Sequence, residues 1–156
     1  MTSLQRTDSF NPGFIELVKA LDAELAERDG GDHSFYAQFN KIDKIRNVVV
    51  AFDDNEAVAC GAIKEWQPGI LEVKRMYTKP QYRGKGIAGK ILSALEKWAV
   101  ELSCHTCVLE TGKKQPEAIA LYKKNGYKII PNYGQYKGVD NSVCFEKKVF
   151  NKATTL

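Results

Sequence analysis

The chain has 156 residues with a formal net charge of +4, and this length allows one sizeable core, so we expect a single domain over residues 1–150 and a tail over 151–156. The basic excess lacks the arginine-rich tract interleaved with aromatics that is typical of nucleic-acid binding, and we expect no nucleic-acid partner. The sequence contains no apolar run of membrane-spanning length and no signal-peptide core at its start, so we expect a cytoplasmic protein without a membrane partner.

The first half of the chain predicts a helix and a three-stranded meander. Asn11-Pro12 supplies an N-cap and a first-turn proline, apolar residues then recur at helical spacing to Leu25, and Gly30-Gly31 ends the helix. A further short helix is expected over 33–39. Three apolar runs separated by turn residues predict strands over 48–52, 57–65 and 70–78.

The second half predicts two helices and three strands. A broad apolar stripe from Ile87 to Leu102 indicates a long amphipathic helix. Pro116 in a first turn and Gly126 just past the end delimit the second helix, over 116–125. The remaining strands are expected over 106–110, 127–130 and 142–149.

The run Gln81-Tyr82-Arg83-Gly84-Lys85-Gly86-Ile87-Ala88-Gly89 lies between a predicted strand and the long helix, and it indicates an anion site. A helix start has free N–H groups and a partial positive charge, which attract anionic oxygens. Gly84 and Gly86 would allow φ > 0 and the close approach of a pyrophosphate, while Arg83 and Lys85 add charge. We therefore expect phosphate binding here.

Two other kinds of nucleotide site also use glycines at similar spacing. Gly84-x-Gly86-x-x-Gly89 matches the dinucleotide fingerprint, and Glu110 lies at about the spacing of its ribose-binding acid. A dinucleotide fold, however, places these glycines after its first strand, whereas three predicted strands precede them here. The Ser or Thr of a Walker loop is also absent after Lys85. An oxidoreductase and a plain capped helix start remain as alternatives.

The order strand, Gln-x-x-Gly-x-Gly, helix resembles the acetyl-CoA-binding motif of the GNAT superfamily of N-acetyltransferases, (Gln/Arg)-x-x-Gly-x-(Gly/Ala). A second segment, Ala118-Ile119-Ala120-Leu121-Tyr122-Lys123-Lys124-Asn125-Gly126-Tyr127, resembles the family's Ala-x-x-Leu-Tyr-x-x-x-Gly-(Phe/Tyr). The element order from about Val48 to Val149 is also similar. The resemblance implies an α/β (α+β) fold with a mixed, mostly antiparallel central sheet flanked by helices, and acetyl-CoA as cosubstrate.

The resemblance also implies a set of site residues. Those expected to contact acetyl-CoA are Met76, Tyr77, Thr78, Gln81, Arg83, Gly84, Lys85, Gly86, Ala88, Gly89, Gln115 and Tyr122. Gln115 stands where the family often has Asn. Tyr122 would protonate the leaving thiolate, although its helical spacing with Ala118, Leu121 and Asn125 equally fits a core tyrosine.

A general base is harder to assign. Strand alternation places Glu72 on one face with Lys74, Met76 and Thr78, and the histone-modifying branch of the family implies a base at the position of Glu72. Glu110, Glu65 and water are the alternatives.

We expect neither a catalytic nor a metal-binding role for the cysteines. A covalent route through Cys60 or Cys144 lacks a histidine placed by sequence to activate it. Cys104-His105-Thr106-Cys107 has the spacing of only half a zinc site. We expect reduced, mostly buried thiols and no metal.

These observations predict an acetyl-CoA-dependent N-acetyltransferase whose acceptor is the amine of a small molecule, such as an amino acid, a polyamine or a drug-like amine. By the resemblance, residues 22–39 and 133–138 would select it, with an aromatic wall made by Phe35, Tyr36, Phe39, Tyr133 and Tyr136. A protein or peptide acceptor and a non-catalytic CoA-binding module are the alternatives. The oligomeric state stays open, with a homodimer as one option.

Overall fold

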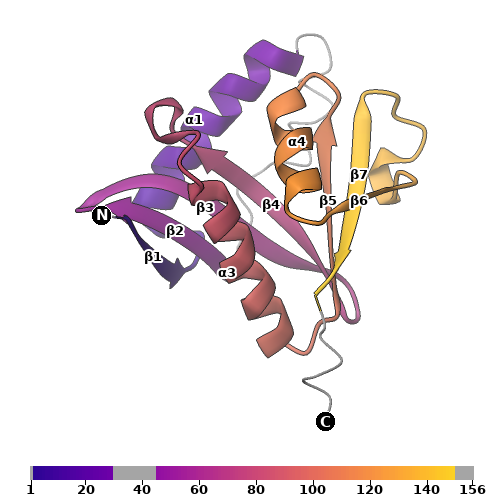
Figure 1. The fold of residues 1–156 in the computed structure, drawn as a ribbon, viewed down its shortest axis with the longest axis horizontal. Helices are drawn as coiled ribbons and strands as arrows, with labels where there is room; N and C mark the ends of the chain where they lie inside the picture. The colour runs from indigo at the N-terminus through magenta and orange to yellow at the C-terminus, as the bar shows by residue number, and fades with distance from the viewer. Residues whose placement is uncertain (1, 30–44, 150–156) are drawn as a thin grey trace.

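The computed structural model of the protein describes residues 2–29 and 45–149, where one seven-stranded sheet carries helices on both faces (Figure 1). The strands are β1 Thr2–Thr7, β2 Asn47–Asp53, β3 Glu56–Gln67, β4 Ile70–Thr78, β5 Thr106–Gly112, β6 Lys128–Ile130 and β7 Ser142–Lys148. The helices are α1 Pro12–Asp29, α3 Ile87–Glu101 and α4 Pro116–Lys124, with the 3-10 turns η2 Pro80–Tyr82 and η3 Gly134–Tyr136. The helix expected over 33–39 and the tail over 151–156 lie outside the described residues.

The strand order is β1-β2-β3-β4-β5-β7-β6. Only β4 and β5 pair in parallel, and every other neighbouring pair is antiparallel. This confirms the predicted mixed, mostly antiparallel sheet and its meander of β2, β3 and β4. The glycine-rich segment follows β4, the fourth strand, so the arrangement is not that of a dinucleotide-binding fold.

The two faces of the sheet bury separate hydrophobic clusters. Val48 and Val50 of β2 pack with α1, whereas Val49 and Ala51 pack with α3. This alternation is what a strand buried on both faces requires. Tyr122 of α4 joins the α3 cluster, so α3 and α4 cover one face and α1 covers the other. None of the helices in the described segments has the length and apolar character needed to cross a membrane.

Strand β1 was not expected from the sequence. Its six residues are mostly polar, and four of them are exposed. Thr2 nevertheless pairs with Asp53 and Thr7 with Val48, which adds β1 to the sheet beside β2. Pairing with a distant segment creates this edge strand, since its own sequence carries no alternating apolar pattern.

Strand β4 is interrupted by a bulge at Arg75 and Met76, both of which lie opposite Gly61 of β3. Arg75 adopts a left-handed conformation with φ of 60°. A bulge inserts one extra residue into a strand and so reverses the direction of the side chains that follow.

The expectation that Glu72 shares a face with Met76 was therefore wrong. Val73, which alternates with Glu72, packs in the α3 cluster, and Met76 packs against the same cluster. Tyr77 lies in the α1 cluster instead. Regular alternation holds for Glu72 and Lys74, and the bulge ends it before Met76.

Strands β4 and β5 diverge along their length. They pair only where residues 70–72 face residues 106–108, although β4 continues to Thr78 and β5 to Gly112 (Figure 1). The sheet is thus open in its middle, beside the glycine-rich segment and α4.

Candidate active site

Two cavities open where β4 and β5 diverge. The smaller one, of about 120 Å³, lies between the two strands and is here called the strand cavity. The larger one, of about 360 Å³, extends along the glycine-rich segment and α4 and is called the loop groove. Both are lined by Leu21, Met76, Gln115, Ala118 and Tyr122, so they meet at these residues.

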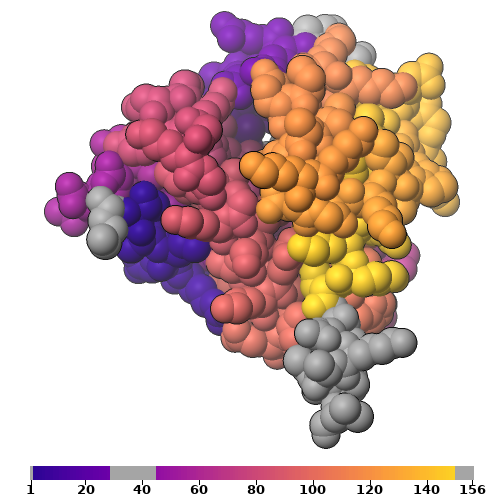
Figure 2. Space-filling model, in the orientation of Figure 1, coloured from indigo at the N-terminus to yellow at the C-terminus, as the bar shows by residue number. Residues whose placement is uncertain are grey.

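The loop groove has the features of an anion site at its glycines. Gly84 and Gly86 have φ of 79° and 81°, and a side-chain carbon added at either would meet no atom within 4 Å. Gly86 is also the N-cap of α3, whose start has no side-chain cap. The hollow is visible in Figure 2 between the glycine-rich segment and α4. A bulky phosphate can therefore approach the free N–H groups of α3 closely.

Most residues expected at the acetyl-CoA site line this groove. They are Met76, Tyr77, Thr78, Arg83, Gly84, Gly86, Ala88, Gly89, Gln115 and Tyr122. Gln81 and Lys85 are not among the lining residues of either cavity, and the Lys85 ammonium lies 5.3 Å from the centre of the Tyr82 ring.

Arg83 points back toward the strands. Its Nε donates to the Thr78 carbonyl at 2.8 Å, and its Nη2 donates to both oxygens of Glu24 at 2.9 and 3.2 Å. Arg28 of α1 makes a second ion pair, in which Nη1 and Nη2 each donate to one carboxylate oxygen of Glu117 of α4, at 2.9 and 3.2 Å. Helix α1 is thus tied to both sides of the groove.

Glu24, Arg28 and Glu117 line the groove, and sequence reasoning did not assign them to the cofactor site. The only signal was their charge at helical spacing, because Glu24 and Arg28 are four residues apart on α1. Such spacing predicts one shared helix face but not the partner that faces it.

Tyr122 belongs to both the core and the site. Its ring centre lies 5.9 Å from those of Tyr127 and Phe145, and its side chain lines both cavities. Burial, together with the charge of Glu110, raises the pKa of the Tyr122 hydroxyl above its ordinary value. The hydroxyl therefore stays protonated near neutral pH.

Glu72 lines the strand cavity and is held by two donors. It is buried, with 6% of its surface exposed. The Tyr133 hydroxyl donates to Oε2 at 2.5 Å, and the Lys74 ammonium lies 3.6 Å from Oε1. Tyr133 is itself packed edge-on against Trp66, with ring centres 5.1 Å apart.

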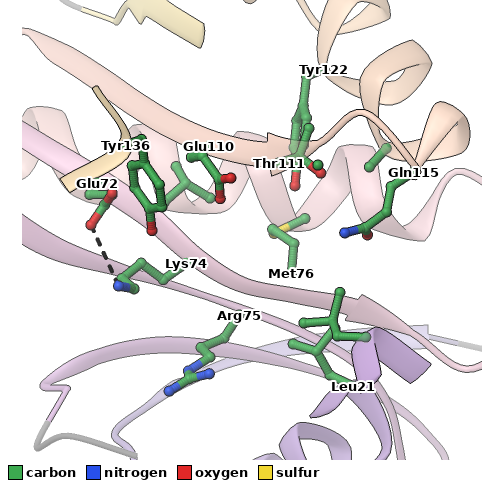
Figure 3. Close-up of a pocket in the computed structure, with 14 residues that line it drawn as sticks. Leu21, Glu72, Lys74, Arg75, Met76, Glu110, Thr111, Gln115, Tyr122 and Tyr136 are labelled. Carbon is green, nitrogen blue, oxygen red and sulfur yellow. Dashed lines mark ion pairs between the residues drawn. The ribbon is translucent and has the colours of Figure 1, made fainter. Parts of the chain in front are cut away.

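Glu110 lines the same cavity from β5 and is half-buried. The Ser142 hydroxyl donates to its Oε2 at 2.7 Å. Figure 3 shows the Glu110 carboxylate between Tyr136 and Tyr122, and Glu72 on the far side of Tyr136 beside Lys74. Glu65, the third carboxylate considered, lines neither cavity.

The aromatic wall is described only in part. Tyr136 lines the strand cavity. Tyr133 does not line it but donates a hydrogen bond to Glu72, which does. Phe35, Tyr36 and Phe39 lie outside the described residues.

The cysteines are poorly suited to covalent chemistry. Burial raises the pKa of Cys60 to about 12 and that of Cys144 to about 11, so both remain thiols at neutral pH. Within residues 2–29 and 45–149, no cluster of three His, Cys, Asp or Glu side chains could hold a metal ion.

Comparison with known proteins identifies relatives along nearly the whole chain. The model of the acetyltransferase (GNAT) family matches residues 14–127. The IAA acetyltransferase of Azospirillum brasilense is 30% identical over 148 residues, which cover 93% of this chain and 96% of that protein. The uncharacterized N-acetyltransferase YjgM of Escherichia coli is 41% identical over 132 residues, or 77% of each chain.

Two solved structures are similar to this chain over nearly its whole length. A Klebsiella pneumoniae protein described as an acyl-CoA N-acyltransferase is 34% identical, with a TM-score of 0.81 over 96% of this chain and 99% of its own. The paia N-acetyltransferase of Thermoplasma acidophilum, solved with coenzyme A, shares the fold at 19% identity, with a TM-score of 0.71 over 95% and 99% of the two chains. The family match and these relatives show that the chain belongs to the GNAT family of N-acetyltransferases.

Proposed function

We propose that this acetyltransferase transfers the acetyl group of acetyl-CoA directly to the amine of a small molecule, such as an amino acid, a polyamine or a drug-like amine. The observation that carries the proposal is the meeting of the two cavities at Met76 and Tyr122. The loop groove has the start of α3, which lacks a side-chain cap, at one end, and the strand cavity has two carboxylates. A donor and an amine can therefore meet beside Tyr122.

The loop groove fits the donor. In this proposal, the N–H groups at the start of α3 bind the pyrophosphate, and Gly84 and Gly86 leave the space that it needs. The pantetheine arm lies between the diverging strands, where, within residues 2–29 and 45–149, β4 has no strand partner beyond Glu72 on the β5 side. Backbone N–H groups near Met76 are candidates to polarise the thioester carbonyl.

The reaction needs a neutral amine and a proton for the departing sulfur. Bound acetyl-CoA supplies an activated acyl carbon and a thiolate leaving group. Tyr122 holds the proton that the thiolate requires, because burial keeps its hydroxyl protonated. A carboxylate of the strand cavity accepts the proton from the amine.

Four free, buried cysteines are in keeping with a reducing compartment, and we assign the protein to the cytoplasm.

The size and place of the strand cavity favour a small acceptor. As bounded by the described residues, its volume is about 120 Å³, a third of the 360 Å³ of the loop groove. A peptide that added to a sheet edge would lie on β1 or β6, at the two ends of the strand order, whereas the cavity lies at β4 and β5.

A panel of acceptors tests this proposal. We expect thiol release from acetyl-CoA with at least one free amine, and kcat/KM for the best amine should exceed that for peptides with free α-amino or lysine groups. A preference of about 10²-fold or more for peptides would overturn the small-molecule assignment. Binding of acetyl-CoA without thiol release from any amine or peptide would indicate a non-catalytic module.

A further inference from the structure

We infer that Met76 limits the length of the acyl group that this enzyme accepts, because its side chain fills the space over Gly61 that a longer acyl chain would need. The inference rests on the proposed function, in which the thioester lies beside Met76, and it names the wall that the carbon chain of the donor meets. Acetyl-CoA should then fit the site, whereas propionyl-CoA and butyryl-CoA should be disfavoured by their size.

Met76 lies where the two substrates meet. It is one of the residues that line both the loop groove and the strand cavity. A thioester carried by CoA in the groove and an amine in the strand cavity come together at this junction. Figure 3 shows the Met76 side chain between Tyr122 of α4 and Leu21 of α1. The shared lining is apolar apart from Gln115 and the Tyr122 hydroxyl, which suits a hydrocarbon chain.

The Met76 side chain has its present place because residue 61 is a glycine. A side-chain carbon added at Gly61 of β3 would collide with the Met76 sulfur. The same carbon would lie only 2.9 Å from Ile91 Cγ2 and 3.0 Å from Leu95 Cδ1, both on α3. Glycine inside a strand often marks such a close approach. The methionine thus occupies the space between β3 and α3 that a side chain at residue 61 would take.

The bulge in β4 directs Met76 into this space. Arg75 and Met76 both lie opposite Gly61, and Arg75 has the left-handed φ of 60°. The fully buried Cys60 thiol donates to the Arg75 carbonyl at 3.2 Å. Two neighbouring residues of β3 therefore support the bulge, since Cys60 contacts its backbone and Gly61 admits its side chain.

Shortening Met76 should extend the acyl site toward Gly61. Met76→Ala removes more atoms than butyryl adds to acetyl, and Gly61 has no side chain to fill the vacated space. The facing wall differs, because Leu21 packs in the α1 cluster among other apolar side chains. One methylene in an apolar pocket changes kcat/KM by about 10- to 200-fold, so the change in preference is large enough to measure.

Calorimetry with acetyl-CoA, propionyl-CoA and butyryl-CoA tests the inference without knowledge of the acceptor. Wild type should bind butyryl-CoA more weakly than acetyl-CoA. The affinity for butyryl-CoA relative to acetyl-CoA should rise by about 10-fold or more in Met76→Ala and in Met76→Val, the second of which suits a strand better. Met76→Leu conserves volume and should keep the wild-type ratio. With an accepted amine, kcat/KM for the three donors should shift in the same direction.

Further variants separate the acyl site from general stability. Ile63→Ala truncates a buried residue of the cluster against which Met76 packs, yet it lines neither cavity, so it should lose stability and keep the wild-type ratio. Gly61→Ala should press Met76 into the junction and weaken acetyl-CoA relative to free CoA. Met76→Ala in the Gly61→Ala background should restore that ratio, because the two side chains are in contact.

An unchanged ratio of butyryl-CoA to acetyl-CoA affinity in both Met76→Ala and Met76→Val would overturn the inference. An equal shift in Leu21→Ala would also overturn it, because the facing wall would then limit the chain. If neither truncated variant folds, Gly61→Ala decides, and wild-type affinities for acetyl-CoA and CoA in that variant would reject the role of Met76. These results leave the proposed function in place. Absence of thiol release by wild type with every amine would overturn the proposed function, whereas the binding ratios would still test Met76.

Discussion

Arg83, the arginine of the glycine-rich segment, is paired with Glu24 of α1, whose two carboxylate oxygens lie 2.9 and 3.2 Å from its Nη2. Its side chain was expected to add positive charge for a phosphate. Because both partners line the loop groove, an anion that binds there competes with Glu24 for the guanidinium. The pair is partly exposed, and such pairs contribute about 1 kcal/mol or less, so a phosphate can displace the carboxylate.

Glu24→Gln should therefore strengthen acetyl-CoA binding by roughly 2- to 5-fold, since it removes a negative charge beside the anion site. Isothermal calorimetry at low and high salt would measure the change, which should shrink as salt screens it. Glu16→Gln is the matched control, because Glu16 is an exposed carboxylate on the same helix and lies 4.0 Å from Lys19. Weaker binding by Glu24→Gln would instead mean that Glu24 positions Arg83 for the phosphate.

Gly86→Glu should abolish acetyl-CoA binding. The substitution places a side chain and a negative charge in the open space at the start of α3, and its φ of 81° strains any L residue by about 1–2 kcal/mol. Gly138→Glu is matched for strain, with φ of 76° and no atom within 4 Å of an added carbon, but it does not line the groove. Both variants should lose similar thermal stability. Equal acetyl-CoA affinity in the two would remove the glycines from the site.

The fold was largely predictable because long apolar patterns specify helices and strands without knowledge of their partners. The meander, α3 and α4 follow such patterns. Strand β1 could not be found in this way, because its polar residues gain their structure from pairing with β2. The bulge at Arg75 was equally hidden, since nothing in the residues 74–77 marks the position at which β3 contributes one residue and β4 two.

The residues of the site could be predicted where backbone conformation determines their place. They could not be predicted where ion pairs between residues distant in the sequence determine it. Gly84 and Gly86 adopt positive φ, which glycine allows without strain, so the residue type itself marks these positions, and both line the groove. Lys85 does not, because its ammonium lies over the Tyr82 ring. Sequence alone places a basic residue beside a loop, but the direction of a long side chain depends on which acid or ring lies near it.

Tyr122→Phe should lower kcat by about 10²-fold and leave acetyl-CoA affinity nearly unchanged, because only the proton donor is lost. The ring keeps its contacts with Tyr127 and Phe145, so the melting temperature should change little. Tyr127→Phe is the converse control. It removes the 3.0 Å hydrogen bond to Glu96, away from both cavities, and should lower stability while kcat is kept. A Tyr122→Phe enzyme with wild-type kcat would identify Tyr122 as a core residue only.

The native protein should react slowly with thiol reagents at pH 8. Burial raises the pKa of Cys60 and Cys107 to about 12 and that of Cys144 to about 11, so the reactive thiolate is scarce until the pH approaches those values. All four cysteines should react rapidly once the chain is unfolded in denaturant. Rapid labelling of a native cysteine, mapped by mass spectrometry, would contradict this burial and would also complicate assays that detect released CoA thiol.

Tyr133→Phe should test how far its hydrogen bond to Glu72 stabilises the protein and its acceptor site. It removes the hydroxyl that donates to the buried Glu72 carboxylate, and losing a hydrogen bond to a charged group costs about 1.5–3 kcal/mol. The ring remains packed against Trp66 and Tyr136, so the loss should appear as lower stability to urea without loss of the fold. Since Glu72 would lose one of the two contacts that hold it, KM for the amine should rise several-fold more than kcat falls. Unchanged stability together with an unchanged KM would contradict this role of the Tyr133–Glu72 hydrogen bond.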